Sequence, residues 1–126
     1  MLQKLFISEK NFLPHIYLDK EKNIFQIKGK SIPEDSREFY KIVFDWFDKY
    51  FEDPNPETIL EFDLDYYNSS SARDIANMIK YFDNKYKEGI KVSIIWYYNI
   101  NDEIMKENEE DFSLLFSLPI KIKAKN

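Results

Sequence analysis

Cysteine is absent from the sequence. Its absence excludes disulfide bonds, thiolate-bound metal ions and cysteine nucleophiles together. The first ten residues lack the basic stretch and apolar core of a signal peptide. No apolar run approaches the ~20 residues that a membrane-spanning helix needs. We therefore expect a cytoplasmic protein with no membrane partner.

Glycine and histidine are also scarce. The only glycines are Gly29 and Gly89, and neither lies in a glycine-rich turn that would bring backbone amides close to phosphate groups. The single histidine, His15, has no second histidine with which to share a metal ion, and no Ser/His/Asp catalytic set can be assembled around it. The sequence therefore predicts no cofactor, no metal site and no enzyme activity.

Positive charge is in deficit. The chain has 18 Lys and Arg against 23 Asp and Glu, a formal net charge of −5. Nucleic-acid binding needs concentrated positive charge to displace counterions, but the basic residues are scattered apart from the tail at 121–125. Three lysines that alternate along an end strand are more typical of a solubilising sheet edge. We expect no nucleic-acid partner.

Apolar and aromatic residues are plentiful, at 44% and 17% of 126 residues. A chain of this size is large enough for one two-layer core. No linker, repeat or low-complexity segment interrupts it. We therefore interpret residues 1–126 as a single domain.

Five segments have the alternation or the β-branched and aromatic content of strands. They are residues 13–19, 24–28, 58–65, 91–98 and 118–123. Three segments with helical spacing follow capping candidates at Asp35, in the serine-rich stretch 68–71 and at Asn101-Asp102. The order β-β-α-β-α-β-α-β predicts an α/β fold, with a mixed sheet of about five strands and three helices on right-handed crossovers.

Three carboxylates alternate along one predicted strand, at Glu61, Asp63 and Asp65. Paired carboxylates can hold Mg²⁺ or divide acid and base roles. The residues between them are apolar and supply the core face, so the simpler interpretation is a polar strand face. A small magnesium-dependent enzyme that uses Asp63 or Asp65 is kept as an alternative function.

The most conspicuous candidate site is Asn68-Ser69-Ser70-Ser71, which we call the serine turn. Asn and Ser are good helix N-caps, but one cap needs only one such residue. A phosphoserine at a helix start is stabilised by free amides and by the helix dipole, and Arg73 is close enough to pair with it. The spacing leaves two interpretations open: a phosphorylation switch, or a constitutive interaction module whose serines only cap the helix.

Candidate partner-binding residues flank the turn: Tyr66, Tyr67, Asn68 and Arg73. Aromatic and arginine side chains are common binding anchors. Successive strand residues point to opposite faces, so we expect one tyrosine to be exposed and the other to lie in the core. Phosphorylation would add about −1.5 to −2 charge, which repels an acidic partner and imposes a desolvation cost on an apolar one.

Several segments together resemble the SiaC-type regulatory phosphoproteins, a family related in architecture to STAS domains and anti-anti-sigma factors. They are IKGKSIPEDS at 27–36, DLDYYNSSSAR at 63–73, WYY at 96–98 and the acidic residues at 109–111. The resemblance covers nearly the whole chain beyond about residue 12. It implies a STAS-like fold for this domain.

The resemblance also implies a non-catalytic partner-switching cycle. The family's phosphoacceptor falls on Ser69, the first hydroxyl after Asn68, with Ser70 as the next choice. A kinase of the anti-sigma-factor type would phosphorylate the turn, and a PP2C-type phosphatase would reverse the reaction. The unphosphorylated protein would bind and control an effector such as a diguanylate cyclase, and so act on cyclic di-GMP and biofilm formation.

Overall fold

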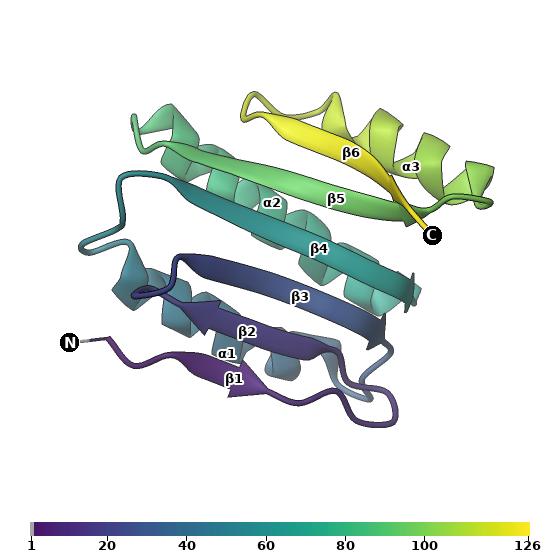
Figure 1. Ribbon diagram of the computed structural model, residues 1–126, viewed down its shortest axis with the longest axis horizontal. Coiled ribbons are helices and arrows are strands. Elements are labelled where there is room, and N and C mark those ends of the chain that lie inside the picture. The colour runs from purple at the N-terminus through teal and green to yellow at the C-terminus, as the bar shows by residue number, and fades with distance from the viewer. Residues whose placement is uncertain (1) are drawn as a thin grey trace.

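The computed structural model describes residues 2–126 of the chain. This part contains six strands and three helices (Figure 1). The strands are β1 (Leu5–Ile7), β2 (His15–Asp19), β3 (Ile24–Ser31), β4 (Thr58–Tyr67), β5 (Val92–Asn99) and β6 (Ile120–Lys125). The helices are α1 (Ser36–Tyr50), α2 (Ser69–Lys87) and α3 (Glu103–Ser113). The predicted α/β class and its three helices are confirmed.

The strands form one mixed sheet in the order β1-β2-β3-β4-β5-β6. β1, β2 and β3 pair antiparallel, whereas β3, β4, β5 and β6 pair parallel. Each parallel step needs a crossover connection, and α1, α2 and α3 supply the three crossovers. Each new strand is added on the same side of the preceding one, so the order in the sheet equals the order in the sequence. Figure 1 shows all three helices on one face of the sheet.

The sheet has one strand more than the five predicted. The additional strand is β1, whose three residues pair with β2 in the register Leu5↔Leu18 to Ile7↔Ile16. Three residues are too few to show an alternation of period two. β1 is therefore a strand because it pairs with the edge of β2, and its own residue pattern does not predict a strand.

The core lies between the sheet and the helices. Along β4, Leu60, Phe62 and Leu64 are fully buried, as their alternation predicted. The aromatic face of α1 packs against this layer through residues that include Phe47 and Tyr50. Within residues 2–126, no helix is long and apolar enough to cross a bilayer.

The helix starts are capped by the residues that the sequence indicated. Asp35 accepts a hydrogen bond from the amide of Glu38 at 3.2 Å, at the start of α1. Asp102 accepts one from the amide of Met105 at 2.9 Å, at the start of α3. These caps satisfy amides that have no partner within the helix and fix where each helix begins.

Candidate functional site

The serine turn joins the end of β4 to the start of α2. Asn68 has extended backbone angles, and its side-chain oxygen accepts a hydrogen bond from the amide of Ser71 at 2.9 Å. The backbone oxygen of Asn68 accepts a second one from the amide of Ala72, also at 2.9 Å. Asn68 is therefore the N-cap, and the turn lies at the carboxyl edge of the parallel strands, where α/β proteins commonly place their sites.

The three serines of the turn have different environments. Ser71 is fully buried, and its Oγ accepts a hydrogen bond from the Oγ of Ser31 at 2.8 Å. Ser69 and Ser70 are both exposed at the first turn of α2. Ser71 is therefore inaccessible to a kinase, whereas the predicted phosphoacceptor Ser69 and its alternative Ser70 are accessible.

A buried hydroxyl chain holds the turn in place. The hydroxyl of Tyr40 on α1 lies 2.7 Å from the Oγ of Ser31 and is its donor, because the proton of Ser31 is used toward Ser71. Burial raises the pKa of Tyr40, which keeps this donor protonated. No local sequence pattern indicates this role of Ser31, and its place within the family-like segment 27–36 is the only signal in the sequence.

A second buried contact ties α2 to α1. The hydroxyl of Ser36, the first residue of α1, donates to the carboxylate of Asp74 one turn into α2. Both residues are buried. The N-terminus of α2 is therefore anchored to β3 through Ser31 and to α1 through Ser36, so a phosphate on the turn would meet a rigid helix start.

The flanking tyrosines face opposite ways, which confirms the expectation that only one lies in the core. Tyr66 is 56% exposed. Tyr67 is half-buried, its ring lies 6.4 Å from that of Trp96, and its hydroxyl donates to the carboxyl of Glu109 at 3.5 Å.

Arg73 is exposed and forms no ion pair within residues 2–126. It follows Ser69 by four residues, on the same side of the helix.

A groove runs between the start of α2 and α3, and we call it the α2–α3 groove. One part, of about 220 Å³, is lined by Tyr67, Ala72, Trp96, Asn108 and Phe112. A second part, of about 230 Å³, is lined by Asp65, Tyr66, Tyr67, Asp102, Ile104, Met105 and Asn108. The two parts share Tyr67 and Asn108, and Ala72 lies one helical turn after Ser69.

The floor of the groove is aromatic. Trp96 lies with its ring 6.0 Å from that of Phe112, edge to face. Its indole Nε1 is buried and has no hydrogen-bond partner within residues 2–126. Ile104 stands at the other end of the groove and is 72% exposed. An aromatic floor with an unused donor and an exposed aliphatic rim has the character of a protein-binding surface.

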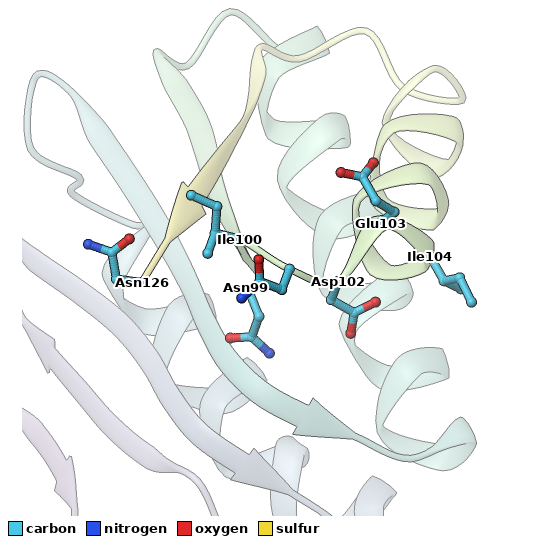
Figure 2. A pocket seen from close by; sticks show the side chains of 7 residues that line it. Asn99, Ile100, Asp102, Glu103, Ile104 and Asn126 are labelled. Atoms are coloured by element: carbon cyan, nitrogen blue, oxygen red, sulfur yellow. The ribbon is translucent and has the colours of Figure 1, made fainter.

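A larger hollow continues from the groove. It has a volume of about 660 Å³ and is lined by Asn99, Ile100, Asn101, Asp102, Glu103, Ile104 and Asn126. Figure 2 shows that these side chains come from the connection between β5 and α3, from the first turn of α3 and from the end of the chain. Asp102 and Ile104 also line the groove. The hollows therefore form one strip, and the serine turn lies beside its first part.

Glu109 is the main electrostatic feature beside the groove. It is fully buried on α3, and its Oε1 has no hydrogen-bond partner within residues 2–126. Burial raises its pKa to about 8, the hydroxyl of Tyr67 and the charge of Lys125 oppose this shift, and Asp102 adds to it. Glu109 is therefore mostly protonated at neutral pH, and the site contains no buried net charge from it.

Glu61 and Asp63 of β4 lie away from the groove, on the sheet face that the helices leave uncovered, whereas Asp65 near the end of β4 also lines the groove. The ammonium group of Lys125 pairs with Asp63 and, at 3.0 Å, with Asp65. Glu61 accepts hydrogen bonds from Gln26 at 3.1 Å and from Tyr97 at 3.3 Å. Residues 2–126 contain no group of three or more His, Cys, Asp or Glu that could hold a metal ion. This geometry favours a charge-paired surface over the magnesium-dependent alternative.

The cap itself allows a direct stability test. Replacing Asn68 with alanine removes the side-chain acceptor of the Ser71 amide, so we expect the free energy of unfolding to fall by about 1 kcal/mol. Urea denaturation followed by circular dichroism measures this change. Asn68→Ser, which keeps an acceptor, is the matched control and should lose much less. Equal stability of Asn68→Ala and the unmodified chain would contradict the capping role.

The fold and the turn together define a class. A mixed sheet with every helix on one face, and a serine-rich, asparagine-capped helix start beside an aromatic groove, describe a small STAS-like α/β domain. The model of the family described as "SiaC family regulatory phosphoprotein" matches residues 7–125. The chain therefore belongs to the SiaC family of regulatory phosphoproteins.

Individual relatives agree with this assignment. A curated, uncharacterised protein of Pseudomonas aeruginosa strain UCBPP-PA14 is 29% identical over 111 residues, which is 88% of each chain. The structure of SiaC of Pseudomonas aeruginosa is similar with a TM-score of 0.87 at 27% identity, over 98% of this chain and 99% of that one. SiaC is also similar where it was solved in complex with diguanylate cyclase SiaD, whose activator it is. There the TM-score is 0.89 at 28% identity, over 96% of this chain and 99% of the other.

Proposed function

We propose that this protein is a non-catalytic switch whose partner binding is controlled by phosphorylation of Ser69. The observation that carries the proposal is the exposed hydroxyl of Ser69 at the anchored start of α2, beside the α2–α3 groove. Amides at a helix start and the positive end of the helix dipole stabilise a phosphate there. Arg73, four residues further, supplies a cation within reach.

The unphosphorylated protein binds an effector through the α2–α3 groove and the residues that flank it: Tyr66, Tyr67, Asn68 and Arg73. The aromatic floor favours an apolar segment of the effector. Asp65 and Asp102 already line the groove, so an acidic segment is disfavoured before any phosphate is added. Phosphorylation then acts mainly by adding a strongly hydrated group at the edge of an apolar contact, which raises the cost of desolvation.

A diguanylate cyclase is the effector that we propose. The support is the family assignment together with the SiaC complex, in which SiaC is the activator of diguanylate cyclase SiaD. By this proposal the protein acts on cyclic di-GMP and on biofilm formation. Its other partners are a kinase of the anti-sigma-factor type and a PP2C-type phosphatase. The cycle belongs in the cytoplasm, because the kinase needs ATP.

The assignment of Ser69 is tested by incubating the chain with ATP and a candidate kinase of this type. We expect the intact mass to increase by one phosphate and peptide sequencing to place the phosphate on Ser69. The Ser69→Ala variant should gain no phosphate, whereas the matched variant Ser70→Ala should still be modified. If Ser69→Ala is phosphorylated as well as the unmodified chain and Ser70→Ala is not, the acceptor is Ser70.

A further inference from the structure

The uncovered face of the sheet carries charge in rows. We call this face, opposite the helices in Figure 1, the open face. The β4 row is acidic and consists of Glu61, Asp63 and Asp65. The β6 row is basic and consists of Lys121, Lys123 and Lys125; Ile120 and Ile122, which alternate with the first two lysines, pack toward the core. The β5 row between them has no charged residue and consists of Ser93, Ile95, Tyr97 and Asn99.

The strand register places the two charged rows level with each other. Glu61 on β4 is the register partner of Ile95 on β5, and Ile95 is the partner of Lys121 on β6. Two residues further, Tyr97 on β5 is the partner of Lys123. Asp63 and Lys123 follow Glu61 and Lys121 by two residues on their strands, whereas the register of β4 with β3 shifts at Asp65. Glu61 therefore has Lys121 at the same level along the strands, and Asp63 has Lys123, on the far side of the uncharged β5 row.

Within one chain, these charges are only partly compensated. Lys125 reaches across β5 to Asp63 and Asp65. Lys121 and Lys123 form no ion pair within residues 2–126, and no ion pair there involves Glu61. The open face therefore keeps an acid on one side of β5 and two cations on the other without partners of opposite charge.

We propose that the open face binds the open face of a second copy of this chain, around a two-fold axis that runs along β5. A rotation of 180° about this axis leaves the position of each residue along the strand direction unchanged and exchanges the two sides of β5. Each acidic row then lies over the lysine row of the other copy, with Glu61 opposite the second copy's Lys121. The uncharged β5 rows, with Ile95 and Tyr97, meet at the centre.

Other axes give the wrong charges. An axis along β4 would place carboxylates over carboxylates, and an axis along β6 would place lysines over lysines. An axis along β3 would place Lys28 of one copy over Lys28 of the other. It would also place the acidic row of each copy over His15 and Tyr17 on β2 of the other copy. A two-fold interface must match its own surface, and only the β5 axis pairs opposite signs throughout.

The dimensions of packed sheets permit this contact. Facing sheets pack about 10 Å apart, a gap that a lysine and a carboxylate side chain span together. Aligned sheets cross at about 30°, and β4 and β6 lie only about 4.8 Å from the axis, so the facing side chains shift by a few ångströms. Three strands make a small interface held by exposed ion pairs. The dimer is therefore weak, and added salt dissociates it.

This dimer leaves the helices outward and is independent of the proposed switch. The strands of the two copies run in the same direction, since the axis lies along β5. Both serine turns therefore lie at the same end of the dimer, where one dimeric partner can bind both. The part of the α2–α3 groove that Tyr67, Ala72, Trp96, Asn108 and Phe112 line is on the helix side and stays open, and Asp65 is the residue that the groove shares with the open face.

Charge reversal tests the proposal on the full chain. Sedimentation velocity and NMR diffusion, run up to millimolar concentration at low salt, should show a monomer–dimer equilibrium that shifts to monomer with salt. Glu61→Lys and Lys121→Glu should each weaken self-association at least tenfold. An equimolar mixture of these two variants should recover a dimer, because each then presents the charge that the other lacks. Lys80→Glu, on the exposed side of α2, is the matched control and should dimerise normally.

Three results would overturn the proposal. The first is an unmodified chain that stays monomeric at millimolar concentration in low salt. The second is a dimer that Glu61→Lys and Lys121→Glu leave as tight as in the unmodified chain. The third is a mixture of the two variants that stays monomeric while circular dichroism shows both to be folded.

Discussion

Between pH 4.5 and about 8, the stability of the unmodified chain should fall relative to Glu109→Gln by about 1.4 kcal/mol for each pH unit. The cause is the burial of Glu109, which raises the pKa of its carboxyl from 4.5 to about 8 in the folded protein. Below pH 4.5 both the folded and the unfolded chain hold this proton, so the unmodified chain and the variant should show no pH-dependent difference.

The sign follows from proton binding. In this window the unfolded chain releases the proton and the folded chain keeps it, so raising the pH favours unfolding. Above about pH 8 both states are ionised, and the difference levels off. Glutamine has nearly the same shape and no proton to lose. Glu109→Gln should therefore be the more stable protein at pH 8, with the hydroxyl of Tyr67 still bonded to a side-chain oxygen.

Urea unfolding of both proteins at several pH values measures this effect. Glu110→Gln, which removes the exposed neighbouring carboxylate, is the matched control and should follow the unmodified chain. Parallel stability curves for the unmodified chain and Glu109→Gln would show that Glu109 ionises normally. That result would show that the buried carboxyl of Glu109, beside the groove, is charged at neutral pH.

The second large effect concerns the switch. Phosphorylation of Ser69 should weaken binding of the effector by a factor of ten or more, which corresponds to at least about 1.4 kcal/mol. The phosphate lies at the edge of the α2–α3 groove and has to lose water when an apolar segment docks there. It also changes the partner of Arg73, which we expect to turn from the effector to the phosphate.

Calorimetry of the phosphorylated and unphosphorylated chain against a purified candidate diguanylate cyclase measures the factor. Ser69→Ala treated with the same kinase is the control and should bind like the unphosphorylated chain. A pull-down that compares Ser69→Ala with Ser69→Asp extends the test to effectors of other kinds. Equal binding by all forms would favour the constitutive module, in which the serines only cap α2.

The helix starts and the serine turn could be predicted from the sequence because they depend on close neighbours. Asn68 caps α2 by bonding an amide three residues away, and such contacts form in almost any surrounding fold. The alternation of Leu60, Phe62 and Leu64 assigned the core face of β4 for the same reason. Continuing that alternation would place Tyr66 in the core, but the register of β4 with β3 shifts at Asp65, so Tyr66 is exposed and Tyr67 packs against the core instead.

Features that depend on distant pairing were beyond such patterns. β1 is a three-residue strand that forms against β2, and no local period marks it. The burial of Ser71 depends on Ser31, which is 40 residues earlier in the chain. The α2–α3 groove combines side chains from β4, β5 and two helices. The charge match between β4 and β6 required the register of both strands with β5.

The sequence by itself therefore determined the order of the elements, the three helix caps, the aromatic core and the family-like segments. All of these rest on contacts within a few residues or on composition. Only the tertiary structure decided which serines of the turn are accessible and which is buried in the core. It alone raised the pKa of Glu109, because burial depends on which distant residues exclude water. The serine turn is thus specified locally, and the surface that it controls is assembled by the packing of α3 against the sheet.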